Sequence, residues 1–206
     1  MATEYPVNVS VDYPDRKLNR LTTFFRLFTV IPILIILALL MYNSFSFSAK
    51  EGGSTAIGIG LVFLPLVLMI LFRKKYPGWW YDWNLNMTKF IYRVNAYFYL
   101  LTDVYPSTDE EQSVHVEMPY PDMASLNRWL PLVKWILVIP HIIVLCFLGI
   151  AALVVIIIAW FAILFTGNYP RGMFDFIVSY MRWCIRIYGY ALILVTDKYP
   201  PFSLSA

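Results

Sequence analysis

The feature that most constrains this chain is a long apolar run, residues 132–165, which few polar side chains interrupt. As one straight helix this run would be about 50 Å long, whereas the hydrocarbon core of a bilayer is about 30 Å thick. Two more apolar runs, 24–41 and 57–72, approach the roughly 20 residues that a spanning helix needs. Because 60% of the 206 residues are hydrophobic and only 14% are charged, we expect an integral membrane protein.

An internal repeat is visible along the chain. Segments 7–15 and 114–122 both begin with valine alternating with polar residues, and both end in Tyr-Pro-Asp. Segments 102–106 and 196–200 both read Thr-Asp-x-Tyr-Pro. An ordered series of such matches predicts a duplicated unit. The two predicted copies are residues 1–108 (copy one) and 109–206 (copy two).

Each copy is predicted to hold a strand, a transmembrane hairpin, an amphipathic helix and a closing strand. In copy one these elements are placed at 5–11, at 21–42 and 56–73, at 79–96, and at 97–105. In copy two they are placed at 112–118, at 129–148 and 150–166, at 172–188, and at 189–199. The turn of the second hairpin is placed near Gly149. The predicted fold class is membrane α-helical, with four transmembrane helices as two tandem hairpin repeats, an interfacial helix after each, and a small cytoplasmic β-sheet.

Charge placement predicts the topology. All Lys and Arg residues except Lys50 lie on one side of the predicted hairpins, and cytoplasmic flanks are enriched in basic residues. We therefore expect a multi-pass protein of the cell inner (plasma) membrane with both termini in the cytoplasm. Pro32 and Pro140 each follow Val-Ile and are expected to bend their helices. Asp15 and Asp122 are expected to cap the helix starts.

Two aromatic-rich segments carry polar residues at helical spacing. These residues are Asp82, Asn86, Lys89 and Arg93 in copy one, and Asp175, Ser179, Arg182 and Arg186 in copy two. Each set falls in a narrow stripe of a helix. The interpretation that we favour places both helices in the cytoplasmic membrane interface, where tryptophan and tyrosine are enriched. The alternative makes each a third spanning helix whose stripe lines a pore or faces another helix, so that the two copies are inverted.

The β-prone ends of the copies are expected to form the sheet. The strand that closes copy one is predicted to pair with the strand that opens copy two through the hairpin-like link 106–111. The two ends of the chain are considered as a second pair. The alternative is that all of these runs are extended linkers.

The candidate binding residues are basic side chains expected near the cytoplasmic surface. Contacts with lipid headgroups are predicted for Arg26, Lys89, Arg93, Lys134, Arg182 and Arg186. His141 is interpreted as a buried or lipid-facing structural histidine, because no second ligand lies at metal-ligand spacing nearby. Cys146 and Cys184 are interpreted as packing residues. No catalytic motif or metal pattern is recognised, so catalysis, a cofactor and a metal are not expected.

These motifs together resemble a known family. The valine-rich strand, Tyr-Pro-Asp, the basic helix start, the hairpin, the Arg-bearing aromatic segment and Thr-Asp-x-Tyr-Pro look like the bacterial membrane family of domain of unknown function four-three-eight-nine. The resemblance covers nearly the whole chain and implies no established activity or catalytic residue.

The function expected from the sequence is that of a non-enzymatic membrane subunit or scaffold. It would assemble with itself or serve as an accessory subunit of a larger membrane complex. The expected partners are membrane lipids and other membrane protein subunits, and not nucleic acid. The first alternative is an anionic-lipid-binding protein that organises the membrane. The second, with less support, is a channel or transporter with a path between the two copies.

Overall fold

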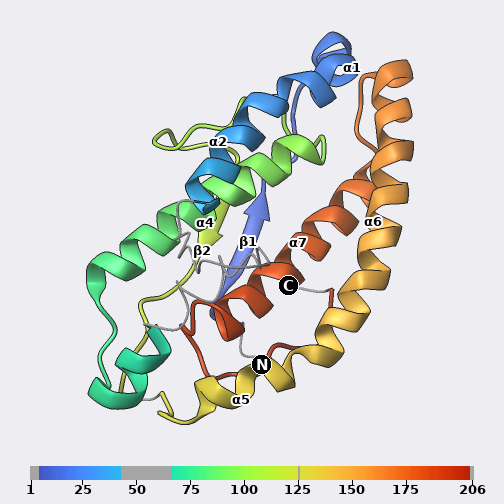
Figure 1. Ribbon diagram of the computed structural model, residues 1–206. Helices are drawn as coiled ribbons and strands as arrows, with labels where there is room; N and C mark the ends of the chain where they lie inside the picture. Colours follow the sequence, from blue (N-terminus) through green and yellow to red (C-terminus); the bar gives the residue numbers. More distant parts are fainter. Residues whose placement is uncertain (1–4, 43–65, 125, 205–206) are drawn as a thin grey trace, which may run out of the picture.

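The computed structural model of the chain describes residues 5–42, 66–124 and 126–204 (Figure 1). The fold is mostly helical and contains one two-stranded sheet. The strands are β1 (Asn8–Val11) and β2 (Val114–Glu117). The helices are α1 (Arg20–Thr29), α2 (Ile31–Tyr42), a short π-helix η1 (Met69–Arg73), α4 (Gly78–Phe98), α5 (Leu130–Leu137), α6 (Ile139–Thr166) and α7 (Arg171–Ala191).

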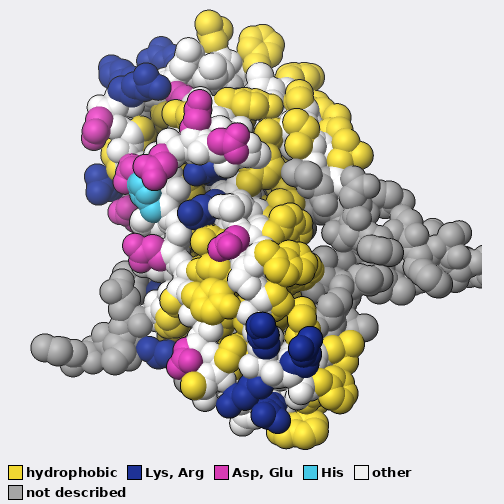
Figure 2. Space-filling model, turned by 90° about the vertical axis from the view of Figure 1, so that its left-hand side faces the viewer, with side chains coloured by type: hydrophobic (Ala, Val, Ile, Leu, Met, Phe, Trp, Pro, Cys, Tyr) yellow, Lys and Arg dark blue, Asp and Glu magenta, His cyan; other side chains and the backbone are white. Residues whose placement is uncertain are grey.

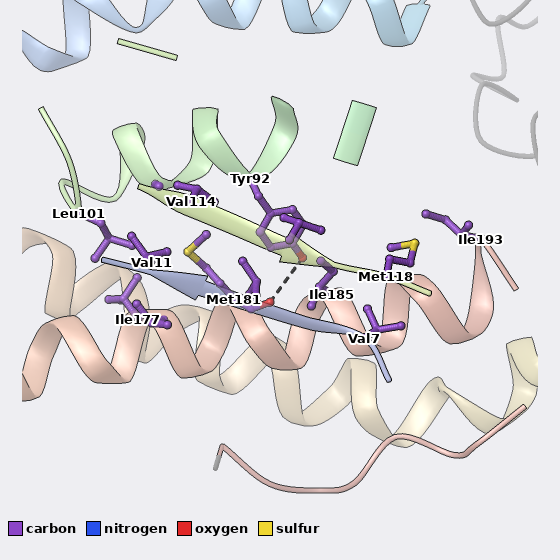
Figure 3. Packing of buried hydrophobic residues seen from close by; sticks show 14 of the residues in the cluster. Val7, Val11, Tyr92, Leu101, Val114, Met118, Ile177, Met181, Ile185 and Ile193 are labelled. Atoms are coloured by element: carbon purple, nitrogen blue, oxygen red, sulfur yellow. Dashed lines mark hydrogen bonds between the residues drawn. The ribbon is translucent and has the colours of Figure 1, made fainter. Parts of the chain in front are cut away.

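The two-stranded ribbon lies between two long helices at the centre of the fold (Figures 1 and 3). β1 packs against α7 and β2 packs against α4. Val7, Val11, Val114 and Met118 are buried on the apolar face of the ribbon, between these helices. On the outside, α6 packs along α7, and α2 packs against α4. The core therefore lies where the apolar face of the ribbon packs against α4 and α7.

The opposite face of the ribbon is polar. Ser10, His115 and Glu117 are exposed there, and the His115 Nε2 atom lies 3.0 Å from a carboxylate oxygen of Asp12. In Figure 2, acidic side chains and one histidine gather toward one flank of the molecule, whereas hydrophobic side chains fill the other flank. The molecule thus has one polar side and one apolar side.

The pairing of the ribbon differs from the sequence prediction. Val9 lies opposite Val116 and Val11 lies opposite Val114, in antiparallel register. The opening strands of the two predicted copies therefore pair with each other. The predicted pairing of 97–105 with the strand that follows it is wrong.

The closing strands are absent from the described part of the chain because the helices before them extend further and end in turns. α4 continues to Phe98, and α7 to Ala191. Leu100 and Leu194 then have positive φ angles of 67° and 59°. The Leu101 amide donates to the Ala96 carbonyl at 2.9 Å, which is the hydrogen bond of a helix-terminating turn. The backbone after each helix is thus turned rather than extended, so the strands predicted at 97–105 and 189–199 do not form.

The bends predicted at the two prolines are confirmed. α1 gives way to α2 at Val30, and α5 gives way to α6 at Val138. Each break lies two residues before Pro32 or Pro140, because proline has no amide to donate and its ring clashes with the preceding turn. The predicted caps are wrong: Asn19, not Asp15, accepts the Leu21 amide in the first turn of α1, and Asp122 accepts the Ala124 amide ahead of α5, whose start has no side-chain cap.

The second predicted hairpin does not form, because α6 is one continuous helix of 28 residues. No turn occurs at Gly149. A Cβ atom at this position would lie 3.2 Å from the Tyr180 hydroxyl of α7. Glycine therefore allows close packing of the two helices here, and its presence in the apolar run does not mark a turn.

Two stretches are long and apolar enough to cross a membrane by length and composition, Arg20–Leu39 and Leu130–Thr166. The predicted segment 56–73 is helical over residues 66–73, and its first part lies outside the described residues. The helices predicted at 79–96 and 172–188 are confirmed as α4 and α7, each longer by a few residues.

Candidate functional site

Arg26 of α1 is held inside the fold by groups at the end of α4. Its Nη1 atom donates to the carbonyl oxygens of Tyr97 at 2.9 Å and Thr102 at 2.7 Å. Its Nη2 atom pairs with the Asp103 carboxylate. The guanidinium carbon lies 4.4 Å from the centroid of the Tyr97 ring, and the residue is only 2% exposed. We call the pair of Arg26 and Asp103 the first anchor.

Lys134 of α5 is held in the same way at the end of α7. Its Nζ atom donates to the Thr196 carbonyl at 2.7 Å and lies 2.8 Å from an Asp197 carboxylate oxygen. The ammonium lies 4.6 Å from the centroid of the Tyr190 ring, and the residue is 0% exposed. We call the pair of Lys134 and Asp197 the second anchor.

Each anchor aspartate also binds the backbone ahead of a helix. Asp103 accepts the Asn19 amide, and Asp197 accepts the Asn127 amide, both at 2.6 Å. Each carboxylate therefore binds both the backbone just ahead of an apolar helix and the cation in the first two turns of that helix. The sequence repeat contains both aspartates in Thr-Asp-x-Tyr-Pro, but their role was missed because Arg26 lies 77 positions from Asp103.

Arg93 and Arg186 bind the chain segments that follow their helices. Arg93 Nη1 donates to the Ser107 carbonyl at 2.8 Å, and Arg186 Nη1 donates to the Ser203 carbonyl at 3.5 Å. Both side chains are buried. Burial, and to a smaller extent the nearby Arg182, lowers the pKa of Arg186.

The remaining two candidates of the polar stripes are half-buried. Arg182 Nε donates to the Asn8 side chain at 2.9 Å and to the Val9 carbonyl at 3.3 Å, so it binds the edge of β1. Lys89 is half-buried on α4. The stripe of α7 therefore faces the ribbon and the C-terminal segment.

This placement speaks against headgroup contacts from four of the six predicted residues. Arg26, Arg93, Lys134 and Arg186 are buried and already bound to oxygen atoms of the chain. Arg26 and Lys134 are also paired with a carboxylate, and breaking such a buried pair would cost about 3–5 kcal/mol. Arg93 and Arg186 donate to carbonyl oxygens of the chain.

His141 lies in an aromatic enclosure at the start of α6. The Trp183 indole donates to His141 Nδ1 at 3.1 Å. The Phe202 ring stacks on the imidazole, with a centroid distance of 3.8 Å and an angle of 9°, and Tyr199 lies beside it. The imidazole is buried and hydrogen-bonded, as the structural interpretation of this histidine expects. Within the described residues, no three His, Cys, Asp or Glu side chains cluster in a way that could hold a metal ion.

Both cysteines are free thiols. Burial raises the pKa of the Cys184 thiol to about 11, although a hydrogen bond with Tyr180 opposes the shift. Since a thiol reacts as the thiolate, Cys184 stays protonated and unreactive at neutral pH. This agrees with a packing role for Cys184, whereas Cys146 is exposed on α6, so its predicted packing role is wrong.

Comparison with known proteins finds a family match over part of the chain and no relative of known activity. No curated protein and no solved structure matches the chain. Residues 129–203 match a domain of unknown function, DUF4389. This range contains α5, α6, α7, Lys134 and Asp197, and so includes the whole second anchor. Residues 129–203 are therefore similar to DUF4389, the family of unknown function that the sequence motifs resemble.

Proposed function

We propose that this protein is a non-enzymatic integral membrane subunit that assembles with itself or within a larger membrane complex. In this proposal the chain consists of two copies of one unit, embedded from the cytoplasmic face of the inner membrane. The polar face of the ribbon contacts the cytoplasm, and the apolar helices lie in the lipid.

The observation that carries the proposal is the exposed apolar surface of α6. Its outward side chains are large and hydrophobic, and they extend along the whole helix: Ile139, Ile142, Ile143, Phe147, Ile150, Leu153, Ile157, Phe161 and Phe165. α1 and α2 expose a similar surface, which includes Phe24, Phe28, Ile35 and Leu39. An apolar surface of this extent marks contact with a membrane or with another protein.

The ribbon favours an interfacial position for α4 and α7. It lies against both helices, and its outer face carries the Asp12–His115 pair and Glu117. If α4 and α7 crossed the bilayer, this face would lie within the hydrocarbon, where charged groups are costly. At the interface it would contact water.

The packing of α6 keeps both termini on one side in this proposal. Its start contacts α7 through His141 and Trp183, and its middle contacts α7 at Gly149 and Tyr180. Gly167, just after its end, accepts the Leu18 amide at 2.9 Å. Both ends of α6 thus adjoin the interfacial layer, so α6 would lie immersed beside α7 without crossing to the other face.

Contacts between matching positions support the duplicated unit. Tyr13 donates to the Tyr169 carbonyl at 2.5 Å, and Tyr120 donates to the Tyr76 carbonyl at 2.7 Å. In both cases a tyrosine of Tyr-Pro-Asp in one copy binds a Tyr-Pro turn of the other. Such an exchange would make the two copies one rigid body suited to a structural subunit.

The channel alternative receives less support. A path between the two copies would run along their symmetry axis, which passes through the pair of Val9 and Val116. Both valines are buried in the apolar core.

The proposal is tested by substituting Ile150, which is exposed on α6, with aspartate. In a membrane or a subunit contact this change should cost about 2.5–3.5 kcal/mol, whereas on a water-exposed surface it would be nearly neutral. We expect I150D to be lost from the carbonate-resistant membrane fraction, or to lose its partners. The matched control, Ser10→Asp on the polar ribbon, should behave as the wild type.

Purification in mild detergent, followed by mass determination, then tests assembly. The expected result is a defined oligomer or a complex with partners in fixed ratio. A lone monodisperse monomer, or an I150D variant that is indistinguishable from wild type in both assays, would contradict the proposal.

A further inference from the structure

Contacts between the two copies bring four basic residues together at one end of the molecule. The Leu18 amide donates to the Gly167 carbonyl, and the Lys17 side chain lies 3.5 Å from where a Cβ atom of Gly167 would be. The Arg171 guanidinium carbon lies 4.5 Å from the centroid of the Tyr13 ring. The first basic junction, as we name it, consists of Arg16, Lys17, Arg20 and Arg171, all of which are exposed.

A second group of basic residues lies at the opposite end. The hydrogen bond from Tyr120 to Tyr76 ties the start of copy two to the segment that follows η1. In Figure 1 the segment before α5 lies beside the helical stretch 66–73. Figure 2 shows Lys and Arg gathered in groups near both ends of the molecule. The second basic junction consists of Arg73, Lys74, Lys75 and Arg128.

Large exposed apolar side chains border both junctions. Leu21 follows Arg20 in the chain, and Phe165 lies two residues before Gly167, which contacts Lys17 and Leu18. Phe72, Trp79 and Trp129 lie next to the second, and the two tryptophans are 69% and 67% exposed. Basic residues beside exposed aromatic residues are the composition of the headgroup level of a membrane, where an aromatic ring and a cation both find favourable surroundings.

The positive charge of the junctions is little compensated within the chain. At the first junction Asp175 lies 4.0 Å from Arg171, but both side chains are largely exposed, so the pair is weak. Asp15 is adjacent to Arg16 in sequence. At the second junction the segment Arg73, Lys74 and Lys75 has no acidic neighbour in sequence. Each junction therefore presents a cationic surface to its surroundings.

We propose that the two basic junctions bind the headgroups of anionic phospholipids. This inference rests on the membrane placement proposed above, and it assigns lipid binding to residues other than the buried anchors. Because each junction combines residues from both copies, lipid binding would depend on the exchange of contacts between them. The two junctions lie at opposite ends, so together they would also fix the tilt of the molecule at the surface.

The test uses the full chain purified in neutral detergent and titrated with short-chain phosphatidylglycerol, phosphatidylcholine or inorganic phosphate. Retained lipid is measured by native mass spectrometry. We expect retention of phosphatidylglycerol only. Arg20→Gln with Arg171→Gln should weaken retention at the first junction, and Arg73→Gln with Arg128→Gln should weaken it at the second. Each pair should lower affinity about thirtyfold, since one basic residue near an anionic surface contributes roughly a fivefold factor.

The control variant, Ser10→Asp, lowers the net charge by one on the polar face of the ribbon, as Arg171→Gln alone does at the first junction, and should retain lipid as the wild type does. Equal retention by the control and by a variant with all four junction substitutions would overturn the inference. So would equal binding of phosphatidylcholine, or a phosphate effect as large as that of the lipid. If the four-substitution variant stays in the membrane and assembles normally but retains unchanged lipid, this inference fails while the proposed function stands. If the wild type is not a membrane protein, the proposed function itself fails.

Discussion

At the scale of single residues, the most informative feature is the pair of buried cations. Arg26 and Lys134 look from the sequence like side chains that reach toward the membrane surface. In the fold each meets an aspartate, carbonyl oxygens and a tyrosine ring. A cation this well satisfied stabilises the particular arrangement of its neighbours, because any other arrangement would leave its charge buried and unpaired.

Substituting Asp197 with asparagine tests the second anchor. Lys134 would remain buried without its counter-charge, so we expect Asp197→Asn to lower the free energy of unfolding by about 3–5 kcal/mol. Adding Lys134→Met should recover much of this loss. The exposed pair of Arg171 and Asp175 gives the control, and Asp175→Asn should cost less than about 1 kcal/mol. Thermal unfolding in detergent measures all of these, and equal effects of the two aspartate substitutions would refute a stabilising anchor.

At the scale of elements, the continuous helix α6 and its contact with α7 distinguish the fold from the predicted hairpin. Glycine in a long apolar run fits both a turn and a close helix contact. The two differ in backbone conformation, because Gly149 lies within α6, whereas Gly167 has a φ of 78° at the end of that helix. An L-residue is favoured at the first position and strained at the second.

Alanine substitutions separate these two kinds of glycine. In a Tyr180→Phe background, which removes the hydroxyl near Gly149, we expect Gly149→Ala to stabilise the protein by about 0.5–1 kcal/mol. With Tyr180 present the gain should shrink, because the new methyl group presses on the hydroxyl. Gly167→Ala, the control, should destabilise by about 1–2 kcal/mol. The free energy of unfolding of each variant is the measurement, and a destabilising Gly149→Ala in the Tyr180→Phe background would favour the turn.

At the scale of the whole molecule, the separation of a polar side from an apolar side is the main property. The ribbon and the loop 106–113 contribute much of the polar side, and α1, α2 and α6 contribute the apolar side. A structure of this kind is expected to insert in one orientation. The positions of Glu110 and the C-terminus relative to the bilayer therefore test the proposed placement.

Cysteine labelling measures this placement. In a chain with Cys146→Ser and Cys184→Ser, we expect Glu110→Cys and Ala206→Cys to react with a membrane-impermeant maleimide only from the cytoplasmic side. Lys50→Cys, in the predicted outside loop, should react only from the other side and serves as the control. The loop itself lies outside the described residues. Labelling of residues 110 and 206 from opposite sides would exclude the placement.

Local features of the fold follow from the sequence because they depend on neighbouring residues. The helices α4 and α7 were predicted from polar residues that recur at helical spacing. The breaks ahead of Pro32 and Pro140 follow from the chemistry of proline alone. The alternating valines predicted the two opening strands, within a few residues of their observed bounds.

The partners of these elements could not be predicted, since each depends on residues far away in the chain. Alternation shows which face of a strand is buried but not which strand lies beside it, so β2 was assigned the wrong neighbour. The headgroup role given to Arg26 and Lys134 rested on their position in the sequence, and the distant aspartates that enclose them were not visible there.

The sequence by itself determined that the chain would form apolar and amphipathic helices, because hydrophobic periodicity and proline act within one or two turns. Only the tertiary structure decided which charges are buried and which are exposed. That outcome depends on contacts between residues far apart in the chain: contacts within each half enclose Arg26 and Lys134, and contacts between the halves hold the basic junctions at the surface.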